Sequence, residues 1–365
     1  MKKYLKTYQI HLKTVGPVFI GSGEILRKSQ WILNFRNKTA TIIDPRKFFD
    51  FLSKEDRLLQ YEEYIMQIKP EPLFKWIEHQ KFSDAQIRQF TAYTLDTTGF
   101  DTKNQRVNDM QLCMKDPYGN PYIPGSSLKG ALRTALLAKK IKEQGYSSSS
   151  IIEEIRDYRG NPKRFLQRES QELKSAMFHT KGRTERKSDM VNDMMSGIRI
   201  SDSNAVSTDC LTLCQKLDEN IDSRISDLPL IRECIKPNVE FQFELSIDET
   251  ETDITKDYIA DAINEFLADY NRIFLSHFKS EVLYSENILY LGGGVGFPSK
   301  TVLNRLLDTN PHRVDLVAKT IDNTLPMKMK RHHKDKHLGV SPSVVKLTET
   351  EGEYYQMGPC RIEFV

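Results

Sequence analysis

The sequence predicts an α+β fold made of two domains whose sheets are mainly antiparallel. The chain has 365 residues, a length that suits about two domains of roughly 150 residues each. Each half contains strand patterns, then an amphipathic helix, then further strands. This order favours α+β domains over a parallel sheet in which every strand is followed by a helix.

Strand patterns open and close the first half. Apolar and polar side chains alternate over residues 8–15, which predicts a half-buried strand. Short apolar runs at 31–33 and 41–43 predict two more strands, and a further strand is expected at 198–202. Apolar side chains recur at helical spacing after the third strand, so residues 46–95 are expected to form a helical insertion.

The second half contains the clearest strand of the chain. Residues 239–247 alternate strictly between apolar and polar side chains. A helix with one apolar face is predicted at 255–278. Strands predicted at 289–291 and 360–364 complete this half.

The domain boundary is expected between about residues 205 and 237. We place it so that an N-terminal domain covers 1–220 and a C-terminal domain covers 221–365. The N-terminal domain then includes the helical insertion and a second insertion at 146–193. That second segment is polar, basic and poor in large apolar residues, so we expect it to be mobile.

Positive charge is concentrated in two stretches, although the net charge of the whole chain is only +3. Residues 156–187 hold ten Lys and Arg against four Asp and Glu, and residues 328–336 hold five Lys and Arg with one Asp. A basic run by itself is more often a solvated loop than a site for a polyanion. Both explanations stay open unless other residues point to nucleic acid.

Several classes of function find no support in the sequence. The five cysteines include one close pair, Cys210 and Cys214, which makes neither a disulfide framework nor a zinc site. We therefore expect a reducing, cytoplasmic location, and no apolar run is long enough to span a membrane. The histidines around Asp335 lack the converging carboxylates of a nuclease. We expect no catalytic residue, no metal and no cofactor.

The segment at residues 123–133 is the most informative for binding. Its small residues let the backbone approach a ligand, and a helix beginning there presents free N–H groups to an anion. The candidates are Gly125, Ser126, Ser127, Lys129 and Arg133. Either serine is a natural N-cap, and the two cations, four residues apart, can reach one anion. A capped turn without any ligand explains the glycine and serines equally well.

A second glycine cluster contains Gly292, Gly293, Gly294 and Gly296, and Lys300 follows it. The spacing does not match the dinucleotide-binding fingerprint. The cluster fits a loop that approaches a phosphate, with Lys300 as its counter-charge. A plain turn between a strand and a helix is the alternative.

These motifs and their companions resemble a known family. Residues 16–23, 122–133 and 198–203 resemble the RAMP superfamily of CRISPR systems. Residues 229–234 and 288–301 are similar, more narrowly, to a subunit of the type III-A (Csm) effector complex. The similarity in order and spacing covers nearly the whole chain.

The resemblance implies two ferredoxin-like, RRM-like domains and a non-catalytic RNA-binding subunit. Such a subunit binds the 3′ part of the crRNA, caps the backbone filament and aids crRNA maturation in antiviral defence. The implied partners are crRNA, the backbone and small subunits of the Csm complex, and cellular nucleases. Its glycine-rich loops line the crRNA path, which adds Gly21, Ser22 and Gly23 to the candidates named above.

One departure from the family bears on catalysis. The backbone subunits that cut target RNA carry an Asp in the loop after the first strand. In this chain, Glu24 is the only carboxylate at residues 23–31. We therefore expect no cleavage, and a metal-dependent ribonuclease that trims crRNA intermediates stays as the alternative.

Overall fold

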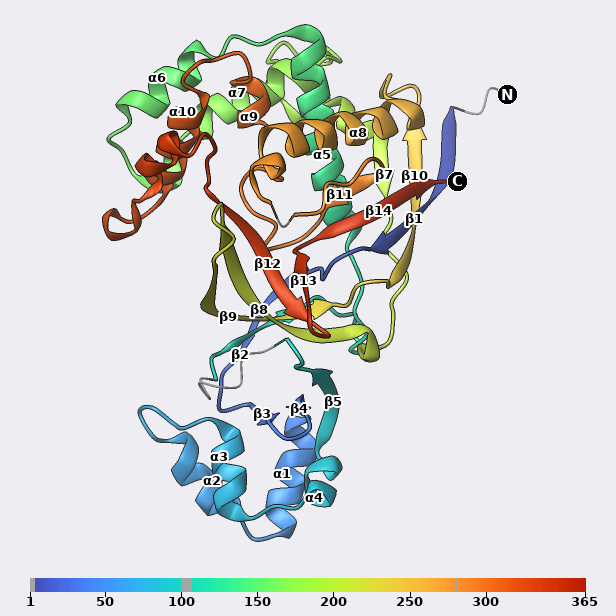
Figure 1. The fold of residues 1–365 in the computed structure, drawn as a ribbon. Helices are drawn as coiled ribbons and strands as arrows, with labels where there is room; N and C mark the ends of the chain where they lie inside the picture. The colour runs from blue at the N-terminus through green and yellow to red at the C-terminus, as the bar shows by residue number, and fades with distance from the viewer. Residues whose placement is uncertain (1–3, 100–106, 280) are drawn as a thin grey trace.

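A computed structural model describes residues 4–99, 107–279 and 281–365 (Figure 1). Two sheets form the body of the molecule, and helices lie at both ends. Most neighbouring strands are antiparallel, because among the described pairs only β5–β8 and β6–β9 are parallel. The predicted α+β class with mainly antiparallel sheets is confirmed.

The first sheet has five strands in the order β11-β14-β1-β10-β7. Its central strand, β1, pairs Ile10 with Phe243 of β10 and Leu12 with Ile362 of β14. Ile10 and Leu12 are buried, whereas His11 and Lys13 between and beside them are exposed. The strands are β1 (Leu5–Thr14), β7 (Ile198–Ile200), β10 (Glu240–Asp248), β11 (Ile288–Tyr290) and β14 (Pro359–Phe364).

Two long helices cover the buried face of this sheet, namely α5 (Gly125–Gln144) and α8 (Lys256–Ile273) (Figure 1). Leu128, Leu132 and Ile263 are buried within the main hydrophobic core. The predicted helix at 255–278 ends earlier, at Ile273, and a short 3-10 turn η5 (Leu275–His277) follows it.

The second sheet has nine strands in the order β2-β6-β9-β8-β5-β4-β3, and β12 and β13 branch from β8. Its two longest strands, β8 and β9, pair with each other, and neither strand was predicted from the sequence. Side chains of β8 are buried on both faces from Leu211 to Gln215, so the strand lacks alternation. The strands are β2 (Gly21–Leu26), β3 (Trp31–Asn34), β4 (Thr39–Ile43), β5 (Thr91–Asp96), β6 (Met110–Cys113), β8 (Leu211–Asn220), β9 (Ile225–Ile235), β12 (Val344–Thr350) and β13 (Glu353–Gln356).

Two neighbouring residues join the sheets. The N–H of Val18 donates to the carbonyl oxygen of Ile235 at 3.0 Å, and the N–H of Ile235 donates back at 2.8 Å. The next carbonyl oxygen, that of Phe19, accepts from the N–H of Gly293 at 2.7 Å. The loop that follows β1 is therefore bound both to β9 of the second sheet and to the glycine-rich loop that follows β11.

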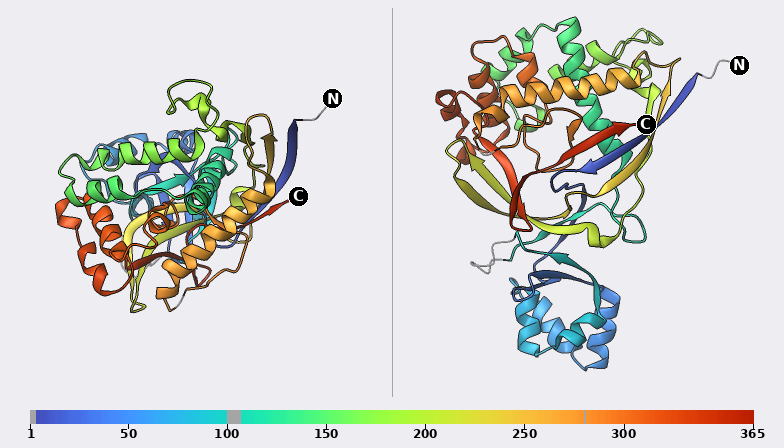
Figure 2. Two further views of the ribbon diagram at one scale, coloured as in Figure 1. Left: turned by 90° about the horizontal axis from the view of Figure 1, so that it is seen from above. Right: turned by 45° about the vertical axis from the view of Figure 1, so that its right-hand side comes forward.

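A helical lobe projects from one end of the second sheet (Figures 1 and 2). It consists of α1 (Pro45–Lys54), α2 (Leu58–Ile65), α3 (Leu73–Gln80) and α4 (Asp84–Gln89). The predicted helical insertion at 46–95 is helical up to Gln89, but its last residues belong to β5. The lobe has an aromatic core made of Phe48, Phe51, Tyr61, Tyr64, Trp76, Phe82 and Phe90.

A group of shorter helices lies at the opposite end, as Figure 2 shows from above. The segment predicted as a mobile insertion contains two α-helices and two 3-10 turns, and its sparse apolar side chains, such as Ile151 and Ile155, are buried. Mobility of this segment stays a prediction. The elements are α6 (Ser149–Asp157), η1 (Pro162–Arg164), α7 (Gln167–Phe178), η2 (Met190–Asn192), η3 (Met194–Gly197), α9 (Leu303–Leu306), α10 (Arg313–Thr324), η6 (Met327–Met329) and η7 (His332–His337). A further 3-10 turn, η4 (Thr208–Cys210), lies apart from them against β5.

Each sheet takes strands from both predicted domains. In the first sheet, β1 pairs with β10 and β14, and in the second, β9 pairs with β6. Residue 220 lies where β8 ends, next to the turn that leads into β9. The division at this residue stays a prediction about folding units, since the sheets do not follow it.

Within the described part of the chain, no helix has both the length and the apolar character needed to cross a membrane.

Candidate RNA interface

The start of α5 is capped by a carboxylate of the chain itself. Pro124 is the N-cap, and the N–H of Gly125 donates to Oδ1 of Asp202 at 2.8 Å. The expectation that Ser126 or Ser127 caps the helix was wrong. The physical reason is tertiary, because Asp202 follows β7 and supplies the negative charge that a helix N-terminus attracts.

Gly125 is required here by packing. A Cβ atom at this position would lie closer than 3.0 Å to the carbonyl oxygens of Ile200 and Ser201, a distance that real Cβ atoms do not show. Only glycine lets α5 begin against the end of β7. This feature matches the ligand-free explanation of the glycine, whereas Ser126 beside it is exposed.

Lys129 and Arg133 bind groups within the protein. The ammonium of Lys129 donates to the carbonyl oxygens of Met195 at 2.8 Å and Ile198 at 2.6 Å, and burial lowers its pKa. Arg133 forms an ion pair of 2.8 Å with buried Asp193. Together they hold η3 against α5. Whether either residue also reaches RNA stays a prediction.

Gly21, Ser22 and Gly23 were expected in a glycine-rich loop, but they are the first residues of strand β2. Gly21 and Gly23 are exposed, and a Cβ at Gly23 would meet nothing within 4 Å. The hydroxyl of Ser22 donates to the carbonyl oxygen of Leu112 at 3.2 Å and accepts from the N–H of Glu24 at 3.1 Å. These bonds fix the start of β2 while leaving its outer side open.

The glycine-rich loop after β11 lies against the segment that precedes this strand. Gly292 has a φ of 77°, and a Cβ there would collide with the carbonyl oxygen of Phe19. The structure thus brings Gly292 and Gly293 against Phe19, two residues before β2 begins. A Cβ on Gly294 would lie 2.6 Å from the guanidinium of Arg232.

Arg232 of β9 is the central cation of this site. Its guanidinium lies over the ring of Phe19, 5.1 Å from the centroid, and its Nε donates to Gln111 at 3.1 Å. Burial lowers the pKa of Arg232, and among the described residues no carboxylate is one of the charges that act on it. A half-buried guanidinium without a counter-charge is unfavourable unless an anion binds.

Lys216 and Lys300 lie near Arg232, Lys346 lies near Lys216, and we name these four residues the cationic cluster. Lys300, at the end of the glycine-rich loop, is exposed over part of its surface; the burial of the remainder, followed by the charge of Arg232, lowers its pKa. Burial, followed by the charge of Lys346, lowers the pKa of Lys216. Among the described residues, Asp218 is the carboxylate that forms an ion pair with the cluster, and its Oδ1 lies 2.7 Å from Nζ of Lys346. The cluster therefore has excess positive charge.

Sequence reasoning found part of this site. It identified Gly292, Gly293, Gly294 and Lys300, and the structure places Gly292 and Gly293 against Phe19 and Gly294 against Arg232. It missed Arg232, Lys216, Lys346 and the ring of Phe19. Arg232 lies inside the motif at 229–234, and the pairing Cys214↔Arg232 places it on the same face of the sheet as Lys216. The start of α5 forms a separate group beside β7.

The open face of the first sheet has a different character. Around a shallow pocket of about 150 Å³, acids and bases are mixed. The ionisable side chains that line it are His11, Lys13, Glu240, Arg361 and Glu363. Mixed charge gives this face no net attraction for a phosphate chain.

Metal ligands do not gather in the described residues, where no three His, Cys, Asp or Glu side chains could together hold an ion.

These loops and this fold agree with a match to a protein family. A family model described as the RAMP superfamily matches residues 11–297. This range includes the glycine-rich loops, the start of α5 and Arg232. The chain belongs to the RAMP superfamily.

Particular relatives lie within CRISPR systems. The chain is 28% identical to the "CRISPR system Cms protein Csm5" of Mycobacterium tuberculosis (strain CDC 1551 / Oshkosh), over 99% of this chain and 98% of that protein. It is 27% identical to the Streptococcus thermophilus protein of the same name, over 84% and 82% of the two chains.

Solved structures share the fold. A chain of a cryo-EM structure titled "Csm-crRNA-target RNA ternary complex in type III-A CRISPR-Cas system" matches with a TM-score of 0.68 and 19% identity, over 98% of this chain and 100% of that one. The crystal structure of T.onnurineus Csm5 matches with a TM-score of 0.59 and 19% identity, over 96% and 99%. The expected ferredoxin-like RAMP fold is confirmed.

The packing of Gly125 predicts a difference between two glycines of one helix. Gly125→Ala should lower the free energy of unfolding by about 2 kcal/mol or more, because the added methyl group meets two carbonyl oxygens. Gly130→Ala should raise it by up to about 1 kcal/mol, because the Cβ there meets nothing. Urea unfolding followed by circular dichroism measures both, and equal effects would contradict this account.

Lys129 should contribute more to stability than an exposed lysine on the same helix. Lys129→Met leaves two carbonyl oxygens without their donor and should cost about 1–3 kcal/mol. Lys142→Met removes only a surface ion pair with Glu265 and should cost less than about 1 kcal/mol. Unchanged stability in the Lys129 variant, together with lost RNA binding, would instead make Lys129 a direct RNA contact.

Proposed function

We propose that this chain is a non-catalytic RNA-binding subunit of a type III-A CRISPR effector complex. In this role it binds the 3′ part of the crRNA, caps the backbone filament and aids maturation of the crRNA 3′ end. The relatives named Csm5 and the related chain in a Csm-crRNA-target RNA complex support this role. The partners are then crRNA and the other Csm subunits, and cellular nucleases perform the trimming.

The cationic cluster is the observation that carries the proposal. Arg232 presents a planar fork suited to phosphate oxygens, and Lys300 adds a point charge at the end of the glycine-rich loop. An RNA phosphate placed there relieves the repulsion between these cations. It also supplies the negative charge that the site lacks.

Small residues leave this site open to RNA. In the proposed complex, the RNA backbone lies against Gly21, Ser22 and Gly23 at the start of β2 and against Gly292–Gly294 in the glycine-rich loop. Contacts with loop backbone and with cations hold phosphates without reading bases, so the proposed grip depends little on sequence. This suits a subunit that must hold many different guides.

The start of α5 has a secondary part in the proposal. Ser126 is exposed and Ser127 half-buried, so their hydroxyls are available to a phosphate or a ribose. Lys129 and Arg133 act by positioning, because they fix η3 and the strand that follows it. Gly125 allows the helix to begin close to that strand.

Cleavage is assigned to other proteins. The rival function is an intrinsic metal-dependent ribonuclease, and it is tested by incubating the purified chain with crRNA precursor and Mg²⁺ or Mn²⁺. We expect intact RNA. Cleavage that persists after stringent purification would contradict the non-catalytic part of the proposal, while leaving the RNA-binding part in place.

Neutralising the cationic cluster should weaken RNA binding in a salt-dependent way. For single-stranded RNA, each phosphate contact contributes about 0.7 to the slope of log affinity against log salt, which is about fourfold in affinity near 0.15 M salt. The double change Lys300→Gln and Arg232→Gln should therefore weaken binding roughly tenfold and flatten the slope by about 1.4. Fluorescence anisotropy across a salt series measures both quantities.

The matched control neutralises two cations on the open face of the first sheet, Lys13→Gln and Arg361→Gln. This variant should bind RNA like the wild type. Equal losses in the two variants would mean that only overall charge matters, and would overturn the assignment of the site. Unfolding curves of all variants separate lost contacts from lost fold.

A further inference from the structure

The start of the first basic stretch, residues 156–164, and the second basic stretch pack against one helix, α10 (Arg313–Thr324). Helix α10 contacts α6 and η1 along one side and η7 along another. Lys319 of α10 donates to the carbonyl oxygen of Arg156 at 2.7 Å, and Asn323 donates to that of Ile155 at 3.1 Å. Buried Ile155, Leu316 and other apolar side chains form a shared core beneath. Figure 1 shows α6 and α10 side by side.

Two carboxylates near the second stretch are used inside the fold, Asp335 of the stretch itself and Asp322 of α10. His332 Nδ1 lies 2.9 Å from Oδ1 of Asp322, and the His332 backbone N–H also donates to this carboxylate. Asp335 is buried and accepts from the hydroxyl of Ser341 at 2.8 Å. These contacts fix η7 on α10 and leave neither carboxylate paired with the exposed lysines of the stretch.

Eight cations from the α6–η1 and η6–η7 segments are exposed, and we define them as the basic surface. In the part of the chain that the structure describes, none of the eight forms an ion pair with a carboxylate. The exposed acids on α6 and α10 are Glu153, Asp157 and Asp315. The basic surface comprises Arg156, Arg159, Lys163, Arg164, Lys328, Arg331, Lys334 and Lys336.

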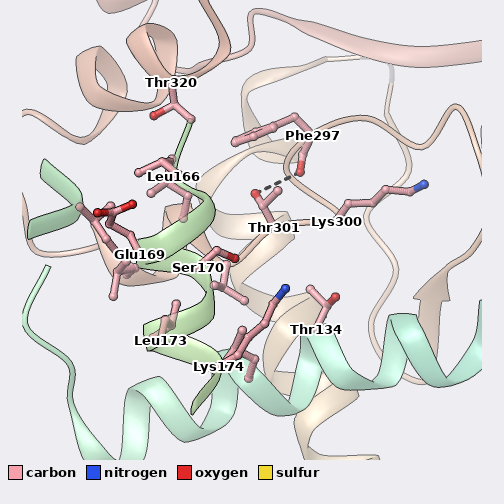
Figure 3. A pocket seen from close by; sticks show the side chains of 15 residues that line it. Thr134, Leu166, Glu169, Ser170, Leu173, Lys174, Phe297, Lys300, Thr301 and Thr320 are labelled. Carbon is pink, nitrogen blue, oxygen red and sulfur yellow. Dashed lines mark hydrogen bonds between the residues drawn. The ribbon is translucent and has the colours of Figure 1, made fainter. Parts of the chain in front are cut away.

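A cleft lies between Lys300 of the cationic cluster and the helices α6 and α10 that support the basic surface. It has a volume of about 290 Å³, and its walls include Lys300, Ile151 of α6 and Thr320 of α10. Its ionisable lining consists of Lys300, Lys174 and Glu169. Figure 3 shows Lys300 extending away from the apolar wall that contains Leu166 and Leu173. Lys300 and the helices beneath the basic surface therefore share one cleft.

We infer that the basic surface is a second binding site for the phosphate backbone of single-stranded RNA. It holds RNA that extends past the cationic cluster. The inference rests on the proposed function, which places RNA at Lys300. We commit to RNA as the occupant, because eight exposed cations from two segments match the repeated charge of a phosphate chain. Such a surface binds a flexible polyanion through charge alone.

The test uses the full-length protein and unstructured RNAs of increasing length. In the first variant, Lys328, Lys334 and Lys336 are changed to Gln, and in the second, Arg159, Lys163 and Arg164 are changed to Gln. The control changes Lys54, Lys69 and Lys75, three exposed lysines of the helical lobe, to Gln. Affinity is measured by fluorescence anisotropy across a salt series, and unfolding curves confirm that each variant is folded.

RNA length should decide the outcome. Short RNAs that occupy only the cationic cluster should bind wild type and all three variants equally. Above a threshold length, both surface variants should lose about fourfold in affinity per phosphate contact removed, or on the order of tenfold in total, with a flatter salt slope. The control should follow the wild type at every length.

Three results would overturn the inference, and they are distinguishable. Surface variants that match the wild type at every length would remove the basic surface from the RNA path, while the cluster variants still test the proposed function. Surface variants that keep RNA but lose an acidic protein subunit of the complex would assign the surface to protein. Wild-type protein that binds no RNA of any length would overturn the proposed function as well.

Discussion

The junction at Val18 and Phe19 is the contact on which the candidate site depends. Val18 forms backbone hydrogen bonds with Ile235 of β9, and Phe19 accepts one from Gly293 in the glycine-rich loop that follows β11. Gly292 has no room for a side chain against Phe19. This fit brings together two loops that are distant in the sequence, and it places the Phe19 ring under Arg232. Without it, Arg232 and Lys300 would not form one site.

Cations of this protein serve two physical roles that look alike in the sequence. Lys129 and Arg133 bind carbonyl oxygens and a buried carboxylate, so their charges are neutralised within the fold. Arg232 and Lys300 repel each other, and among the described residues no carboxylate is one of the charges acting on them. Internal partners offset the cost of burying the first pair, whereas the second pair would gain from the external anion that we propose. That difference separates a structural cation from a binding one.

Elements with one exposed face could be predicted from the sequence, and elements without one could not. The alternation of β1 and β10 reports a sheet that is buried on one side only. The β8 strand is covered on both faces, so its residues show no period and were assigned to a domain boundary. The N-cap of α5 was predicted as a serine because caps are usually local, but Asp202 arrives from beyond β7. The glycine clusters and Lys300 could be recognised from local composition. Arg232 could not, because the residues around it come from neighbouring strands that are distant in the sequence.

The sequence by itself determined the α+β class, the glycine-rich loops and the presence of two basic stretches, because each is a local pattern. Only the tertiary structure decided which residues surround each pattern. Helix α10 packs against both α6 and η7, so that cations of the two basic stretches are brought onto the same helix, while the carboxylates of Asp322 and Asp335 are bonded within the fold. Charge is a property of single residues, but an electrostatic field depends on which charges are neighbours and which are neutralised, and chain folding sets both.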